Sequence, residues 1–161
     1  MRQLRESDVR AAAIVTSSTV DRNMVSELTD TGIPVVSCNS DPAGRFVSNF
    51  SIEYGPGIQK AIQHIVVLGH HSAAVISGPG GNRTAVTIKN ALVTGLTTPG
   101  LKAVCVLESN YRVDAGASAV REVLSGAQFP TVLFCGNDLI AMGALEKSGV
   151  RISGRRFSHR N

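Results

Sequence analysis

The sequence has no tryptophan, and aromatic residues make up only 4% of its 161 residues. A hydrophobic core must therefore be built from valine, isoleucine, leucine and alanine, within a chain that is 43% hydrophobic. No apolar run approaches the roughly 20 residues that a membrane-spanning helix needs. The N-terminal residues also lack the apolar stretch of a secretory signal peptide. These absences predict a cytoplasmic globular protein with enough residues for a real core.

Cysteine is scarce and has no recognisable spacing. Cys38, Cys105 and Cys135 each lie in or at the end of an apolar run, and no C-x-x-C or zinc-type pattern occurs. We therefore expect three buried, reduced thiols.

Catalytic signatures are missing as well. The sequence has no G-x-S-x-G nucleophile elbow, no carboxylate pair placed for acid–base chemistry, and no phosphate-binding loop. Gly78–Asn82 is rich in glycine, but Pro79 removes an amide donor, which favours a structural hinge. His64, His70 and His71 have no accompanying carboxylate and are expected at a helix end or on the surface. We predict no enzyme activity, no cofactor and no metal.

Positive charge is concentrated at one end. The net charge of +4 is accounted for by four arginines, with no acid, in residues 151–161, so residues 1–150 carry no net charge. A solvated basic tail is the simpler interpretation, and a nucleic-acid contact is the alternative.

One pattern recurs four times: a helix-like segment, a glycine, then a short apolar run. The helix-like segments are 24–31, 58–68, 84–94 and 114–125, the glycines are Gly32, Gly69, Gly95 and Gly126, and the apolar runs are 33–37, 73–77, 101–107 and 131–135. Glycine just past a helix supplies the left-handed C′ residue. Valine-rich runs of this length indicate strands covered on both faces. The alternation predicts an α/β fold with parallel strands.

Two further strands are predicted outside this repeat. Residues 11–17 form a first strand, followed by a helix over 20–31 that Thr19 or Asp21 would cap. Residues 46–52 mix polar and apolar side chains and are expected as an edge strand.

Polar residues come directly after the last apolar run. Asn137 and Asp138 lie beyond Cys135 and precede a helix-like segment, with Asp138 as the expected N-cap. In open α/β sheets, ligands bind at this end of the strands.

Five segments, in order along the chain, resemble the effector-sensing core of LacI/GalR-type transcription regulators. They are Gly32–Val36, Ser51–Gly57, Ala61–His70, Ala74–Pro79 and Gly136–Gly149. The resemblance implies an α/β, periplasmic-binding-protein-like fold of two Rossmann-like parallel-sheet lobes, the first of them incomplete. It places a partial N-terminal lobe at residues 1–77, a C-terminal lobe at 78–150 and an atypical basic tail at 151–161, with Gly78-Pro79 as a crossover between lobes. A small effector would bind between the lobes of a homodimer.

The sequence also departs from the family. The helix-turn-helix head that would bind operator DNA and an opening strand–helix–strand unit do not precede Val9, and the tail lacks the family's apolar strand and acidic pair. Ile88 stands where the family carries an arginine that grips the effector, and Ala91 stands where glycine is usual. Isoleucine cannot donate hydrogen bonds to an anion, so we expect an uncharged, sugar-like or nucleoside-like effector.

The resemblance names the residues expected at the effector site, and each has a simpler structural role. Asn82 and Thr84 follow the expected crossover and are polar groups suited to sugars or purines, or else a turn residue and a helix cap. Tyr111 would stack on the effector, or simply pack in its loop. Asn137 is the best candidate for a hydrogen bond to a ligand hydroxyl, whereas Asp138 is more typical of a helix cap.

Other functions stay open from the sequence. A solute-binding protein of a sugar transporter would share the fold, and a small α/β enzyme would need a catalytic constellation that is not found. A non-functional gene fragment would account for the departures at both ends and for the lost arginine.

Overall fold

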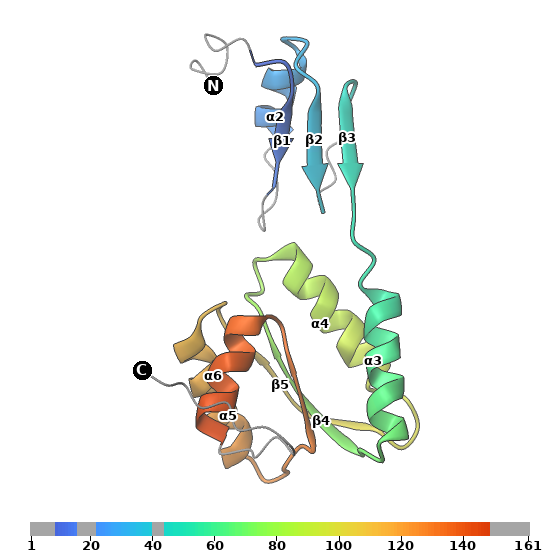
Figure 1. Ribbon diagram of the computed structural model, residues 1–161, viewed down its shortest axis with the longest axis vertical. Coiled ribbons are helices and arrows are strands. Elements are labelled where there is room, and N and C mark those ends of the chain that lie inside the picture. The colour runs from blue at the N-terminus through green and yellow to red at the C-terminus, as the bar shows by residue number, and fades with distance from the viewer. Residues whose placement is uncertain (1–8, 16–21, 40–43, 149–161) are drawn as a thin grey trace, which may run out of the picture. The chain divides into compact units, whose positions relative to one another are not determined.

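The computed structural model describes residues 9–15, 22–39 and 44–148 of the chain. It comprises two compact units (Figure 1). The first unit takes the described residues up to Tyr54 together with Gly81–Thr84, and the second takes Gly55–Gly80 and the described residues from Ala85 onward. Each unit is built on its own three-stranded, all-parallel sheet. The predicted α/β class with two parallel-sheet lobes is confirmed.

The first unit contains strands β1 (Ala12–Ile14), β2 (Val35–Cys38) and β3 (Val47–Phe50), in the order β1-β2-β3, and helix α2 (Arg22–Thr29). The predicted first strand is present but short. The end of that prediction and the proposed caps Thr19 and Asp21 lie outside the described residues. Among the described residues β3 pairs with β2 alone, at the end of the strand order, as expected of an edge strand.

One face of the first sheet is better covered than the other. Val25 and Leu28 of α2 are buried, and α2 contacts β2. Along β2, Val35 and Ser37 are buried whereas Val36 between them is 42% exposed. Parallel sheets are usually covered on both faces. Within the described residues, one face of the first sheet is therefore left partly exposed.

The second unit is a doubly wound sheet. Its strands are β4 (Ser72–Ser77), β5 (Lys102–Glu108) and β6 (Val132–Cys135), in the order β5-β4-β6, and its helices are α3 (Gly55–Val67), α4 (Arg83–Gly95), α5 (Val113–Ser125) and α6 (Asp138–Ser148). Figure 1 shows α3 and α4 on one face of the sheet and α5 and α6 on the other. The four repeats of the sequence pattern correspond to α2–β2, α3–β4, α4–β5 and α5–β6.

The central strand β4 separates two hydrophobic cores. Ala73 and Val75 belong to the core beneath α3 and α4, together with Ile62, Ile65, Leu92, Leu96 and Leu101. Ala74 and Ile76 belong to the core beneath α5 and α6, together with Ala119, Val120, Val123, Ile140 and Ala144. Successive strand residues point to opposite faces of a sheet. An uninterrupted apolar run is therefore required wherever both faces are covered.

The repeated glycines fall into two groups. Gly32 and Gly69 have φ of 79° and 80° and end α2 and α3 as predicted. For α3, the Gly69 N–H donates to Val66 O and the His70 N–H donates to Ile65 O, which is the Schellman pattern. The prediction of a left-handed glycine after the helix was wrong for Gly126 and Gly95. Gly126 has φ of −70°, and Gly95 is the last residue of α4. A Cβ on Gly95 would overlap the end of the Ile62 side chain, which packs against α4 at this position.

Helices α5 and α6 meet backbone to backbone. A Cβ on Gly143 would overlap the Val113 carbonyl oxygen and would lie 2.8 Å from the Ala117 nitrogen. A Cβ on Gly116 would likewise overlap the Ile140 carbonyl oxygen. These two glycines set the spacing between the helices, because any larger residue forces them apart.

The expected lobe boundary at residues 77/78 needs correction. The structure divides after Tyr54, and α3 and β4 belong to the second unit. β4 is hydrogen-bonded to β5 and β6 and supplies both hydrophobic cores, so it cannot belong to another lobe. The Gly78-Pro79 segment comes after the central strand of the second sheet, so the first lobe does not end there. Residues 151–161 lie outside the described part of the chain.

The three thiols are free, but they are half-buried rather than fully buried as expected. Burial raises the pKa of Cys135 to about 11. Burial, and secondarily the charge of Glu122, also raises the pKa of Cys105. Both thiols are thus protonated and poorly nucleophilic at neutral pH. No helix among the described residues has the length and hydropathy needed to span a bilayer.

Replacing Gly143 with alanine should lower the free energy of unfolding by about 3 kcal/mol, because the new methyl group meets backbone atoms of α5 that cannot move independently. Gly57→Ala in α3 is the matched control. Nothing lies within 4 Å of its Cβ position, and alanine there should stabilise the helix by roughly 0.5 kcal/mol. Urea unfolding of the two variants measures both effects. A Gly143→Ala protein as stable as the parent would contradict the close helix contact.

Candidate functional site

The carboxyl ends of β4, β5 and β6 form one edge of the second sheet. Ser77, the last residue of β4, is in register with Glu108, the last of β5, and Ile76 is in register with Cys135, the last of β6. Because all three strands are parallel, the segments that come after them begin at the same edge. Ligands bind at this edge in open α/β sheets.

Buried polar groups at this edge are satisfied within the protein. Ser77 is almost fully buried, and its hydroxyl lies 3.2 Å from the Leu107 carbonyl oxygen and 3.1 Å from that of Gly78, able to donate to either. The Ser109 N–H donates to Ser77 O at 3.0 Å, and the Gly136 N–H donates to Ile76 O at 2.8 Å. The strand ends are therefore held rigidly and can position the loops attached to them.

Tyr111 packs directly on the backbone of Gly78. A Cβ on Gly78 would overlap the tyrosine ring, and a Cβ on Gly136 would lie 2.8 Å from the Gly78 nitrogen. Gly78 is therefore enclosed by the segments attached to the ends of β5 and β6. Tyr111 is half-buried and also contacts the core beneath α5 and α6. The structure thus supports the packing role of Tyr111 and leaves part of the side chain exposed at the candidate edge.

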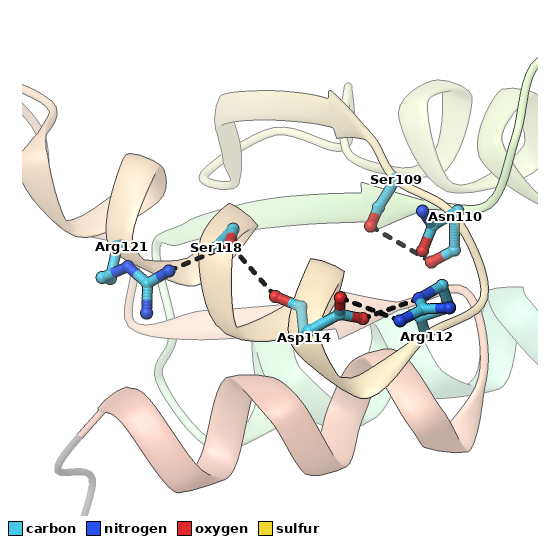
Figure 2. Close-up of polar contacts among 6 residues, drawn as sticks. All are labelled: Ser109, Asn110, Arg112, Asp114, Ser118 and Arg121. Atoms are coloured by element: carbon cyan, nitrogen blue, oxygen red, sulfur yellow. Dashed lines mark hydrogen bonds and ion pairs between the residues drawn. The ribbon is translucent and has the colours of Figure 1, made fainter.

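Polar contacts hold the segment that carries Tyr111 (Figure 2). Arg112 binds Asp114 through two contacts, from Nε to Oδ1 at 2.9 Å and from Nη2 to Oδ2 at 3.1 Å. These hydrogen bonds are the main cause of the lowered pKa of Asp114 and the raised pKa of Arg112. On the next turn of α5, the Ser118 hydroxyl donates to Asp114 O and accepts a hydrogen bond from Arg121. The start of α5 is thereby fixed.

Asn137, not Asp138, caps α6. The Asn137 Oδ1 accepts the Ile140 N–H at 2.9 Å, and its backbone carbonyl accepts the Ala141 N–H at 3.1 Å. Asp138 is the first residue of the helix and is exposed. The prediction of Asp138 as the cap was one residue too late, because an N-cap side chain must reach an N–H two or three residues ahead. The capping bond uses only the oxygen of the Asn137 amide, and its NH₂ group can still donate.

The remaining predicted residues lie around the start of α4. Asn82 is 8% exposed and directly precedes the helix, where amide side chains commonly cap. Thr84 is already the second helical residue, so it does not occupy the cap position. Both are grouped with the first unit, whereas Tyr111, Asn137 and Asp138 belong to the second. Their role in ligand binding stays a prediction.

Ile88 packs against the core beneath α3 and α4. Its neighbour Lys89 instead reaches the edge and pairs with Glu108. Hydrogen bonding from Lys89 is the main reason that the pKa of Glu108 is lowered, and the Gly80 N–H contributes as well. The sequence pattern did not predict this ion pair. The available signal was a carboxylate at the last position of an otherwise apolar strand. Among the described residues, no group of three or more His, Cys, Asp or Glu is placed to hold a metal ion.

Comparison with known sequences identifies relatives of this chain. The family described as periplasmic binding proteins and sugar binding domain of LacI family matches residues 1–158. The chain is 25% identical over 134 residues to the probable transcriptional repressor ExuR of Bacillus subtilis, covering 82% of this chain and 40% of that protein. It is 28% identical over 138 residues to catabolite control protein A of Priestia megaterium, covering 82% and 41%. The chain thus spans about two fifths of the length of these relatives.

Solved structures with a similar fold include members of the same family. A LacI family transcriptional regulator from Mycobacterium smegmatis is 27% identical with a TM-score of 0.72, over 94% of this chain and 58% of that one. The Caulobacter myo-inositol binding protein is 20% identical with a TM-score of 0.75, over 91% and 52%, and shares the fold. The family match covers nearly the whole chain, and both units have the parallel α/β architecture. The chain belongs to the family of periplasmic binding proteins and LacI-type sugar-binding domains.

Proposed function

We propose that the chain is the effector-binding part of a LacI-type transcription regulator and acts in the cytoplasm, not as an enzyme. Its ligand is a small, uncharged, sugar-like or nucleoside-like molecule, which binds at the carboxyl edge of the second sheet. The observation that carries this proposal is that Tyr111 and Asn137 follow β5 and β6, the two strands that flank β4, with Tyr111 and Gly136 packed against Gly78. The repressor relatives support regulation rather than transport or catalysis.

The two side chains offer complementary contacts. The Tyr111 ring suits the apolar face of a sugar or a base. The Asn137 amide, held by its capping bond, can direct its NH₂ group to a ligand hydroxyl. Ile88 lies against the core and offers no charge, which favours an uncharged ligand.

A sugar-transport binding protein is the second candidate. It is favoured by the fold shared with the Caulobacter myo-inositol binding protein. The sequence relatives favour the regulator, since both are named as regulatory proteins.

We also propose that the chain forms a homodimer through α6. Ile140 and Ala144 face the core, yet Leu139, Met142 and Leu145 are 43%, 42% and 44% exposed. These three lie at successive three-residue steps and form an apolar stripe on one side of the helix. A helix that is apolar on both sides is normally covered on both. A second copy, related by two-fold symmetry, would bury the stripe against itself.

Ligand binding should raise the unfolding temperature of the chain, because a ligand that binds only the folded state stabilises it. A panel of neutral sugars and nucleosides at millimolar concentration tests this by thermal unfolding. Tyr111→Ala should weaken the ligand found in this way about tenfold by calorimetry, whereas Tyr111→Phe keeps the ring and should bind nearly as the parent does. If Tyr111→Ala binds the ligand as tightly as the parent protein does, Tyr111 does not contact the ligand.

Substitutions at Asn137 should separate helix capping from ligand contact. Asn137→Ala should lower the free energy of unfolding by about 1 kcal/mol, because the Ile140 N–H loses its acceptor. Asn137→Asp keeps that acceptor but removes the NH₂ donor, so it should retain stability and still lose ligand affinity. Urea unfolding and calorimetry give the two readings. Full ligand affinity in Asn137→Asp would show that the residue acts only as a cap.

Met142→Glu should convert the dimer to a monomer, because a charge would be buried at the centre of the α6 stripe. Val67→Glu is the matched control, since Val67 is an exposed apolar residue on α3, away from the stripe. Light scattering after size-exclusion chromatography measures both masses. A monomeric parent, or a Met142→Glu protein that stays dimeric, would refute this interface.

A further inference from the structure

An ion pair occupies the β5 side of the candidate edge. Glu108 ends β5 beside Ser77, and its carboxylate pairs with Lys89, which reaches across from α4. The Gly80 backbone N–H lies near the same carboxylate and helps to lower its pKa. Three segments of the second unit therefore converge on one carboxylate: the end of β5, the loop after β4, and α4.

The loop is shaped to receive this carboxylate. A Cβ on Gly80 would lie 2.7 Å from the Glu108 Oε2, closer than real side chains approach. Glycine at this position lets the carboxylate lie against the backbone, just as Gly78 lets Tyr111 lie against it.

The pair leaves Glu108 with hydrogen-bonding capacity. A carboxylate offers about four acceptor positions, of which the hydrogen bond from Lys89 takes one. The Glu108 side chain is 50% exposed, whereas that of Lys89 is 22% exposed. The carboxylate, rather than the ammonium group, is thus the part of the pair that a bound molecule meets. Hydrogen bonding from Lys89 lowers the pKa of Glu108, so it is ionised at neutral pH.

We propose that Glu108 is a specificity-determining residue that accepts hydrogen bonds from adjacent hydroxyls of a neutral polyol or sugar and excludes anionic analogues. The inference rests on the proposed ligand site and names the chemistry of its ligand. Neighbouring hydroxyls can donate in parallel to one carboxylate. An anionic sugar would meet the carboxylate with its own charge, and Lys89 cannot compensate because Glu108 already neutralises it. Tyr111, three residues further on, would cover the apolar face of the same sugar.

Two sugars that differ only at one carbon test the charge selection. D-Galactose and D-galacturonate are the probes, with myo-inositol as a second neutral polyol, and calorimetry on the whole chain gives affinities. The parent should bind a neutral probe at least about tenfold more tightly than galacturonate. Glu108→Gln should weaken the neutral probes about tenfold and should bind galacturonate more tightly than the parent does, because Lys89 is no longer neutralised.

Glu122→Gln on α5 is the matched control, since it removes an exposed carboxylate away from the edge and should leave both affinities unchanged. If Glu108→Gln does not fold by circular dichroism, Lys89→Met serves instead. It keeps the carboxylate and should bind the neutral probes within about threefold of the parent while still excluding galacturonate. Galacturonate binding by Lys89→Met would overturn the inference.

The remaining outcomes separate this inference from the proposed function. If the parent binds a sugar and Glu108→Gln keeps the same affinities, the ligand site stands and the role of Glu108 is refuted. If the parent protein binds galacturonate more tightly than the neutral probes, the proposed role of Glu108 is likewise refuted. If no sugar or nucleoside binds the parent, the proposed function is refuted and the inference falls with it.

Discussion

The burial of β4 on both faces is the constraint on which the second unit depends. Ala73 and Val75 on one side and Ala74 and Ile76 on the other are fully inaccessible to solvent. Each pair anchors a separate helical layer, so both layers are held by one short strand. The strand can carry both because its backbone pairs with β5 on one side and with β6 on the other. Small side chains at two of the four positions also leave room for the helices.

The same strand determines where the candidate site lies. β4 ends at Ser77, whose buried hydroxyl is satisfied by the backbone, and the chain then enters a glycine-rich loop. Residues from neighbouring segments pack against the backbone of that loop, at glycines that have no side chain of their own. Tyr111 and Gly136 close on Gly78, and Glu108 closes on Gly80. Neighbouring segments thus occupy the Cβ positions of Gly78 and Gly80, whereas that of Gly81 is open.

Two ion pairs lie at this edge, which also carries the exposed carboxylate of Asp138. Lys89 is paired with Glu108, and Arg112 is paired with Asp114 at the start of α5. An ionic ligand would have to displace one of these partners, whereas a neutral ligand with hydroxyl groups would not. The position of Ile88 against the core has the same consequence. These arrangements favour an uncharged ligand over a charged one.

The sequence by itself determined the features that depend on near neighbours. The alternation of helices and apolar runs predicted every repeat of the fold and the parallel sheets, because the period of hydrophobicity acts within a few residues. Gly32 and Gly69 were recognised as helix ends because the Schellman bonds span only five residues. Four of the five predicted site residues lie in or just before the first turn of a helix, although the cap of α6 was predicted at Asp138 and lies at Asn137.

Only the tertiary structure decided the features that depend on distant partners. Gly95 has the sequence context of a helix end, yet it is set by the approach of Ile62 from another helix. The unit boundary at Tyr54 results from the pairing of β4 with strands that come later in the chain. The Lys89–Glu108 pair joins residues 19 positions apart. No local pattern encodes these contacts, because they exist only once separate segments are packed against one another.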